Sequence, residues 1–145
     1  MGLTNAPIPL DVGEIARMMN ASGLIRTQNL RIERADPNEQ RLDIVMPFAA
    51  GLERACDSGQ FHGGAVTSLI DTTACFCVAM LQREPPPTVE VRTDFLRPAM
   101  APWIRASAEV RRLGRSLALV DVDVTDSQER LVAIGRASFL LAMRA

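Results

Sequence analysis

Hydrophobic and polar residues alternate through the second half of the chain, as expected of strands that bury one face. The period of two is clear in residues 89–95, 104–110 and 120–124, and an apolar run over 131–141 closes the chain. Short links rich in turn-forming residues separate these runs. The pattern therefore predicts four antiparallel strands arranged as a meander, with one face exposed and the other covered.

The first third of the chain predicts one short helix and two further strands. Asp11 and Glu14 have the spacing of a capping box, and apolar residues keep helical spacing from there until Gly23. The runs 24–34 and 41–46 have the composition of strands, with a turn sequence between them.

A long helix is predicted over residues 63–82, because its apolar positions extend almost all the way around. Such a helix must be buried, and a curved antiparallel sheet is the simplest cover for it. The fold class is therefore α+β. Asp71 is the exception in this helix. A buried carboxylate costs free energy, so Asp71 is either bonded to a threonine or arginine, or serves as a general base or nucleophile beside a pocket.

The chain of 145 residues has the length of one domain. We expect an N-terminal segment with the short helix over 1–23, followed by the main domain over 24–145. A net charge of −1 argues against a nucleic-acid partner. No membrane-length apolar run and no secretory signal are recognised, so we expect no membrane partner and a cytoplasmic location.

All sixteen basic residues are arginines, and the chain has one histidine and no tyrosine. Lysine-dependent chemistry is thus excluded. Cys75 and Cys77 point about 200° apart on a helix and cannot bind one metal ion together. With a single histidine, we expect no metal site and no cofactor.

The sequence His62-Gly63-Gly64 opens the long helix. The first backbone N–H groups of a helix lack partners within it, and glycines let a ligand oxygen approach them closely. Gly63 and Gly64 therefore have the character of an oxyanion-binding site. A lone histidine at a helix start is either structural or, in another class of enzyme, a working acid or base.

Three segments together resemble the hotdog-fold thioesterases, in particular the phenylacetate-pathway (PaaI-like) acyl-CoA thioesterases. They are FHGGAVTSLIDTTACFCVAM over 61–80, TVEVRTDFLRPA over 88–99 and RRLGRSLALVDVDV over 111–124. The resemblance implies the hotdog fold, an antiparallel sheet wrapped around one long buried helix. It also implies hydrolysis of acyl-CoA thioesters, with coenzyme A present only as part of the substrate.

By position, the family's carboxylate falls on Asp71, and the backbone N–H that polarises the thioester carbonyl falls on Gly63. A hydroxyl that holds the attacking water in some members falls near Thr88. Family members often have an asparagine six residues before the histidine, where this chain has Cys56. Either a neighbour such as Asp57 or Gln60 substitutes for it, or turnover is slow, or the protein only binds its ligand.

Spacing on the helix predicts a shared site. Gly63 and Asp71 lie eight residues apart, or about 12 Å along the axis, whereas reacting groups must lie within about 3.5 Å of one carbonyl carbon. Two antiparallel helices related by a two-fold axis satisfy both conditions. We therefore expect a homodimer, or a tetramer made as a dimer of dimers.

The phosphates of coenzyme A require cationic partners. Arg97 follows a predicted strand, and Arg112 and Arg115 flank Gly114 at a predicted hairpin, a turn that the family uses near the nucleotide. Arginine suits phosphate because its guanidinium donates two parallel hydrogen bonds. A merely solvated turn is the alternative.

The sequence leaves three functions open. The first is hydrolysis of aryl- or medium-chain acyl-CoA, because Thr67, Ala74, Cys75 and Val78 around Asp71 leave only a modest gap. The second is a hotdog dehydratase or hydratase, which would need His62 as acid or base. The third is a non-catalytic acyl-CoA binder or sensor, which Cys56 would suit.

Overall fold

The computed structural model describes residues 7–142. Its elements in chain order are α1 (Val12–Asn20), α2 (Gly23–Gln28), β1 (Arg31–Asp36), β2 (Arg41–Pro47), the 3₁₀ turn η1 (Ala50–Leu52), α3 (Gly63–Gln82), β3 (Thr88–Phe95), β4 (Trp103–Leu113), β5 (Leu117–Asp126) and β6 (Leu131–Leu140).

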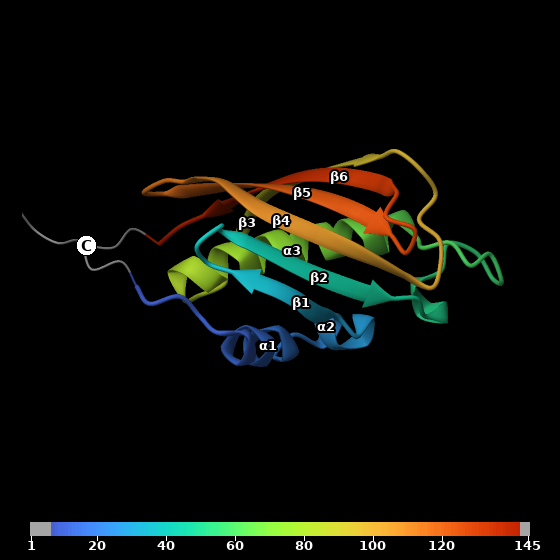
Figure 1. Cartoon of the computed structure of the whole chain (residues 1–145), viewed down its shortest axis with the longest axis horizontal. Coiled ribbons are helices and arrows are strands. Elements are labelled where there is room, and N and C mark those ends of the chain that lie inside the picture. Colours follow the sequence, from blue (N-terminus) through green and yellow to red (C-terminus); the bar gives the residue numbers. More distant parts are fainter. Residues whose placement is uncertain (1–6, 143–145) are drawn as a thin grey trace, which may run out of the picture.

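The six strands form one antiparallel sheet in the order β1-β2-β4-β5-β6-β3, and the sheet curves over one side of α3 (Figure 1). This is the α+β hotdog arrangement expected from the sequence. Alternate residues of β4 and β5 point inward against α3, where Ile104, Ala106, Val120 and Val124 are fully buried. Burial of this apolar layer is the main favourable contribution to folding.

The helix α3 has the predicted bounds. It is long and apolar enough to cross a membrane, but most of it is buried within the molecule. Leu69, Ile70 and Met80 are inaccessible to solvent. The hydropathy of α3 is thus that of a core helix covered by a sheet.

The prediction of a strand over 24–34 is wrong at its start. Ser22 caps a short helix, α2, by accepting a hydrogen bond from the N–H of Ile25, and Asn29 ends it in the left-handed conformation. The strand β1 begins only at Arg31. Serine before the run and asparagine after it are helix-capping residues, and these signals outweigh the apolar composition between them.

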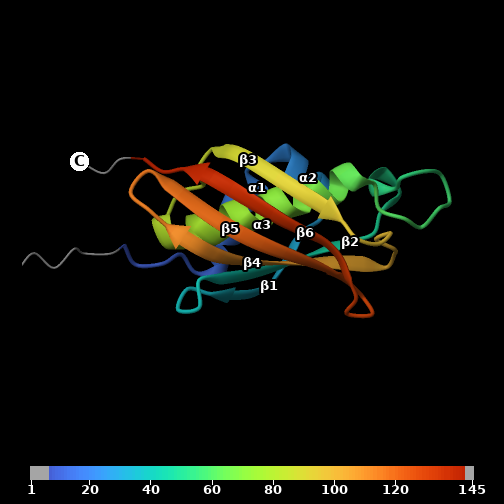
Figure 2. The ribbon, with the colours of Figure 1, turned by 90° about the horizontal axis from the view of Figure 1, so that it is seen from above.

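The predicted meander is also corrected. β4, β5 and β6 follow one another in the sheet, but β3 pairs with β6 at the far edge and β4 pairs with β2 (Figure 2). The link over 96–102 carries the chain back across the end of the sheet. Backbone bonds from Phe61 to Ala99 and from Phe48 to Pro102 hold it there. This crossing leaves β3 as an edge strand beside α3.

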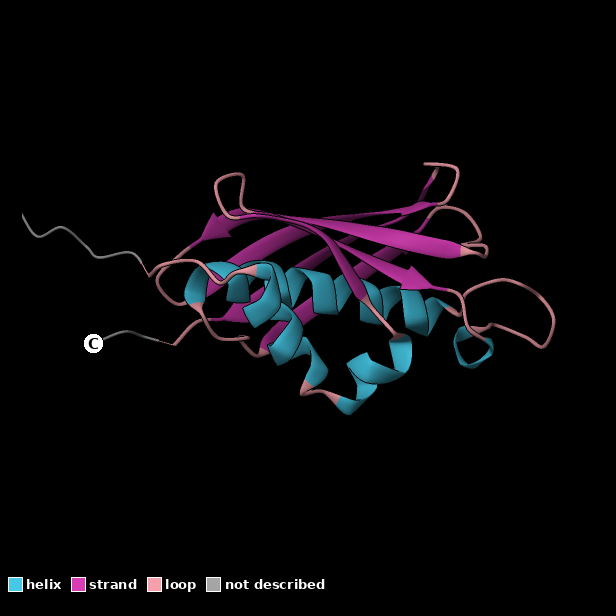
Figure 3. Ribbon diagram, turned by 60° about the horizontal axis from the view of Figure 1, so that its bottom comes forward, coloured by secondary structure: helices cyan, strands magenta, loops and turns pink. Residues whose placement is uncertain are grey.

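The helices α1 and α2 lie on the side of α3 that the sheet leaves open (Figure 3). Ile15 and Met19 of α1 belong to the same core as α3, and Leu10 donates a backbone hydrogen bond to Met80. The predicted capping box of Asp11 and Glu14 is present.

Candidate active site

One side of α3 runs antiparallel along the edge strand β3. The hydroxyl of Thr67 donates to the hydroxyl of Thr93 at 3.0 Å, and further along α3 the thiol of Cys75 donates to the Pro86 carbonyl at 3.5 Å. β3 pairs only with β6, so its outer edge has no strand beside it in the described chain. The line of contact between α3 and β3 therefore lies at a free sheet edge.

Asp71 lies on α3 between those two contacts. The hydroxyl of Thr88 donates to Asp71 Oδ1 at 2.9 Å, which brings together two predicted site residues from different elements. Asp71 is half-buried rather than fully buried as the sequence suggested, because it faces the edge strand instead of the sheet interior. Within the described chain no donor bonds its second carboxylate oxygen, which is left for a ligand.

Cys75 is one helical turn beyond Asp71 and is not a competing nucleophile. Burial, together with the negative charge of Asp71, raises the pKa of the Cys75 thiol to about 12. The thiol is therefore protonated at neutral pH, and the thiolate is the reactive form of cysteine. Asp71, and not Cys75, is therefore the candidate for chemistry on this side of α3.

Gly63 opens α3, eight residues before Asp71. A Cβ on Gly63 would lie 3.2 Å from the ring of the exposed Phe95, so a side chain here would require that ring to shift by a few tenths of an ångström. No described residue accepts a hydrogen bond from the Gly63 N–H. This N–H is thus a free donor at the positive end of a twenty-residue helix.

His62 and Gly64 are engaged with each other. His62 caps α3, and its Nδ1 accepts a hydrogen bond from the Gly64 N–H at 2.8 Å. The Gly64 N–H is therefore already satisfied, which does not favour the predicted contact with substrate. The same bond gives His62 a structural function and places the ring proton of the neutral imidazole on Nε2.

A pocket of about 380 Å³ adjoins Gly63. Arg97 reaches it from the end of β3, as predicted, and also donates to the Leu131 carbonyl at 2.7 Å. The complete lining is Arg54, Gln60, Phe61, Gly63, Val66, Phe95, Leu96, Arg97, Pro98, Ala99 and Val132. Neither Asp71 nor Thr88 belongs to it, in agreement with the eight residues that separate Asp71 from Gly63 along α3.

Arg112 and Arg115 are exposed at the hairpin between β4 and β5. This hairpin lies at the opposite end of the sheet from the start of α3 and from the link that follows β3 (Figure 1). Within a single chain, the predicted site residues therefore lie in two separate groups. Gly63 and Arg97 lie at one end, and the hairpin arginines lie beyond Thr88 at the other.

The four small neighbours of Asp71 do not border one common space. Ala74 and Val78 are fully buried in the core, whereas Thr67 and Cys75 contact Thr93 and Pro86. The helical neighbours of a residue do not all share its surroundings, because the sheet covers one side of α3 and leaves the other open.

The sequence did not reveal Arg54 or Phe61 as pocket residues. Their only signal is nearness to the His62-Gly63-Gly64 motif, which could not show where the loop side chains point. Of the two proposed substitutes for the family asparagine, Gln60 lines the pocket, while Asp57 is exposed in the loop with a φ of 58°. Gln60 is therefore the better placed of the two.

Comparison with known proteins agrees with this geometry. The chain matches the family model of the thioesterase superfamily over residues 58–133. No curated protein matches it in sequence.

Solved structures resemble the fold closely. A protein of the thioesterase superfamily has a TM-score of 0.84 and 27% identity, covering 90% of this chain and 98% of its own. Zebra fish thioesterase superfamily member 2 has a TM-score of 0.78 and 26% identity, with 90% and 96% covered. The E. coli PaaI protein from the phenylacetic acid degradation operon has a TM-score of 0.78, with 90% and 93% covered, and at 22% identity it supports the fold alone. Since the family model spans more than half of the chain, this protein belongs to the thioesterase superfamily.

Proposed function

We propose that this protein is an acyl-CoA thioesterase of the PaaI-like type, in which Asp71 and the Gly63 N–H act on the thioester. One observation carries the proposal. The same helix presents a carboxylate held by Thr88 through one oxygen and, eight residues earlier, a backbone donor with no partner in the described chain. A thioesterase requires these two functions, a base or nucleophile and an oxyanion donor.

In the proposed reaction, Asp71 accepts a proton from water while the water oxygen attacks the thioester carbonyl carbon. The Gly63 N–H stabilises the negative charge that develops on the carbonyl oxygen. The C–S bond then breaks, and the leaving thiolate takes the proton from Asp71. Direct attack by Asp71, followed by hydrolysis of the resulting anhydride, is the second route. The bond from Thr88 fixes the carboxylate in either case.

The two groups belong to different copies of the chain in this proposal. The free edge of β3 exposes Val89 and Phe95, at 61% and 57%, and an unpaired apolar edge is suited to pairing with another strand. If β3 of two copies pairs antiparallel about its middle, Thr88 of one lies near Phe95 of the other. Because the Phe95 ring adjoins Gly63, the partner's Gly63 then approaches Asp71. The result is a homodimer with two shared sites. Two such dimers would form the tetramer.

The two arginine groups would then meet at one substrate. The partner's Arg97 comes with the partner's Gly63, while Arg112 and Arg115 come with Asp71 and Thr88. Coenzyme A carries a pyrophosphate and a 3′-phosphate that such arginines can bind. We expect the KM for acyl-CoA to rise with salt concentration, because salt screens these contacts.

The acyl group is proposed to be aryl or medium-chain. Beyond Asp71 along α3, the thiol of Cys75 contacts the Pro86 carbonyl, and this contact limits the length of acyl chain that could extend along this side of the helix. The PaaI-like assignment favours an aromatic acyl group. We expect kcat/KM for phenylacetyl-CoA or hexanoyl-CoA to exceed that for palmitoyl-CoA, and a preference for palmitoyl-CoA would contradict this limit on chain length.

A thiol-release assay with this panel tests the function directly. Wild-type protein should release coenzyme A from at least one acyl-CoA, while Asp71→Asn should not. Asp123→Asn, which changes an exposed carboxylate on β5, away from the β3 edge, serves as the matched control and should retain activity. Absence of both thiol release and hydration in wild-type protein that still binds acyl-CoA would favour the binder or sensor instead. Hydration of an enoyl-CoA by wild-type protein that is lost in His62→Asn with unchanged stability would favour the hydratase.

A further inference from the structure

We propose that Arg54 binds the phosphate of the substrate nearest to the thioester, the 4′-phosphate of the phosphopantetheine arm. The inference rests on the proposed function, because it assigns the pocket beside Gly63 to that arm. Arg54 and Arg97 line this pocket together with Gly63 and a largely apolar wall. The apolar wall and the two guanidinium groups of this pocket match the phosphopantetheine arm, which is partly apolar and ends in a phosphate.

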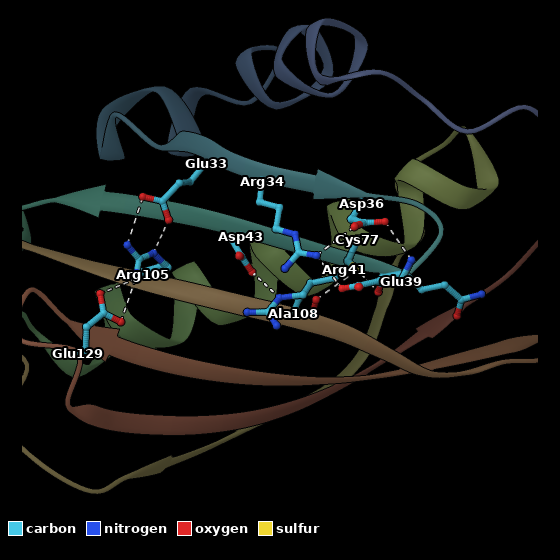
Figure 4. Close-up of polar contacts among 11 residues, drawn as sticks. Glu33, Arg34, Asp36, Glu39, Arg41, Asp43, Cys77, Arg105, Ala108 and Glu129 are labelled. Atoms are coloured by element: carbon cyan, nitrogen blue, oxygen red, sulfur yellow. Dashed lines mark hydrogen bonds and ion pairs between the residues drawn. The ribbon is translucent and has the colours of Figure 1, made fainter.

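Arg54 is available to an anion, unlike most arginines of the sheet. Eight arginines of the described chain form ion pairs with carboxylates. Figure 4 shows Arg105 between Glu33 and Glu129 as an example. Arg54 and Arg97 have no carboxylate partner among residues 7–142. Positive charge is therefore left uncompensated at this pocket.

The loop that carries Arg54 is held in one conformation by Glu53. The carboxylate of Glu53 accepts hydrogen bonds from the N–H of Gly59 at 2.8 Å and from the N–H of Asp57 at 3.2 Å. The Arg54 N–H donates to the Gln60 carbonyl at 2.8 Å and closes the loop at its base. Because Glu53 is engaged by these N–H groups, its charge is not paired with the neighbouring guanidinium. Glu53 thereby positions Arg54 and leaves it free.

The 4′-phosphate is favoured over the other phosphates by position. The pocket contains both Gly63, which would bind the thioester carbonyl, and Arg54. Of the phosphates of coenzyme A, only the 4′-phosphate is attached directly to the pantetheine arm. The same phosphate is present when the arm is attached to an acyl carrier protein, so Arg54 would recognise a chemistry that the two carriers share.

Calorimetric titration tests the binding of the 4′-phosphate by Arg54 without depending on turnover. Wild-type, Arg54→Gln and Arg31→Gln proteins are titrated with coenzyme A, 4′-phosphopantetheine and pantetheine. Arg31 is the matched control, because it is also exposed and without a carboxylate partner but lies on β1, outside the pocket. We expect Arg54→Gln to lower the affinity for coenzyme A and the affinity for phosphopantetheine each by about tenfold. Pantetheine binding should not change, and Arg31→Gln should match wild type.

Two results with Arg54→Gln overturn the inference: a loss of affinity for coenzyme A alone, or an equal loss of affinity for all three ligands. The inference is also overturned if wild-type protein binds neither phosphorylated compound. A wild-type protein that shows the expected pattern but hydrolyses no acyl-CoA would refute the proposed function and leave the phosphate site standing.

Discussion

The hydroxyl of Thr88 donates to the carboxylate of Asp71 at 2.9 Å, joining the middle of α3 to the first residue of the edge strand β3. This bond orients one carboxylate oxygen and leaves the other without a partner in the described structure. A carboxylate at the border of a free sheet edge has two properties that the proposed reaction requires, a fixed direction and access for a ligand.

Substitutions at this pair should affect the rate and not the fold. Asp71→Asn should lower kcat for thioester hydrolysis by about 10²–10⁴-fold, the usual contribution of a positioned acid or base. Thr88→Val should lower kcat by about tenfold with little change in KM, since it removes only an orienting bond. Both variants should keep the Tm within about 4 °C of wild type, because neither residue is buried. Unchanged kcat in Asp71→Asn would exclude the carboxylate from the reaction.

The three cysteines should differ sharply in reactivity. Cys56 is exposed, whereas burial raises the pKa of both the Cys75 and Cys77 thiols to about 12. At pH 8 the two buried thiols are protonated, so a disulfide reagent such as DTNB should modify one thiol in native protein and three in denaturant. Cys56→Ser should abolish the native reaction. A second fast-reacting thiol in native protein would contradict the burial of Cys75 and Cys77.

Asp126 should give a pH-dependent contribution to stability. Its side chain is 3% exposed, and although burial opposes ionisation, bonds from the Arg130 guanidinium and two backbone N–H groups hold its pKa below the ordinary 3.8. In the unfolded chain it titrates near 3.8, so the stabilisation is fully present above that pH and is lost as pH falls through the lower, folded pKa.

Asp126→Asn should therefore lower the free energy of unfolding by about 2 kcal/mol at pH 7. The difference from wild type should narrow below pH 3.8. Urea denaturation at a series of pH values measures both quantities. A difference that stays constant down to pH 3 would mean that the charge of Asp126 is not the stabilising feature.

Much of the fold could be predicted because its signals are local. The bounds of α3 follow from the glycines that open it and the prolines after it, and β4 and β5 follow from their alternation. The order of strands could not be predicted in this way. Whether β4 lies beside β3 or β2 depends on how the link over 96–102 crosses the end of the sheet, and that link has no repeating pattern to indicate its path.

The candidate site also has features that could be predicted from the sequence and features that could not. Asp71 and Gly63 stand out in sequence because a carboxylate and a glycine pair are unusual in an apolar helix. The partial exposure of Asp71 and the bond between His62 and Gly64 could not be predicted, since both depend on which neighbouring element covers each side of α3. Arg54 was missed because its environment is set by a loop that the carboxylate of Glu53 holds through backbone bonds.

The central claim is that one site takes Asp71 from one copy and Gly63 from another, and mixing two inactive variants tests it most directly. Asp71→Ala removes the carboxylate, and Gly63→Pro removes the N–H at a helix position that tolerates proline. After subunit exchange at equal amounts, about half of the dimers are mixed and each has one intact site, so thioester hydrolysis should return to about a quarter of the wild-type rate. Mixed dimers, verified by co-purification of two tags, that hydrolyse no faster than the separate variants would contradict the shared site.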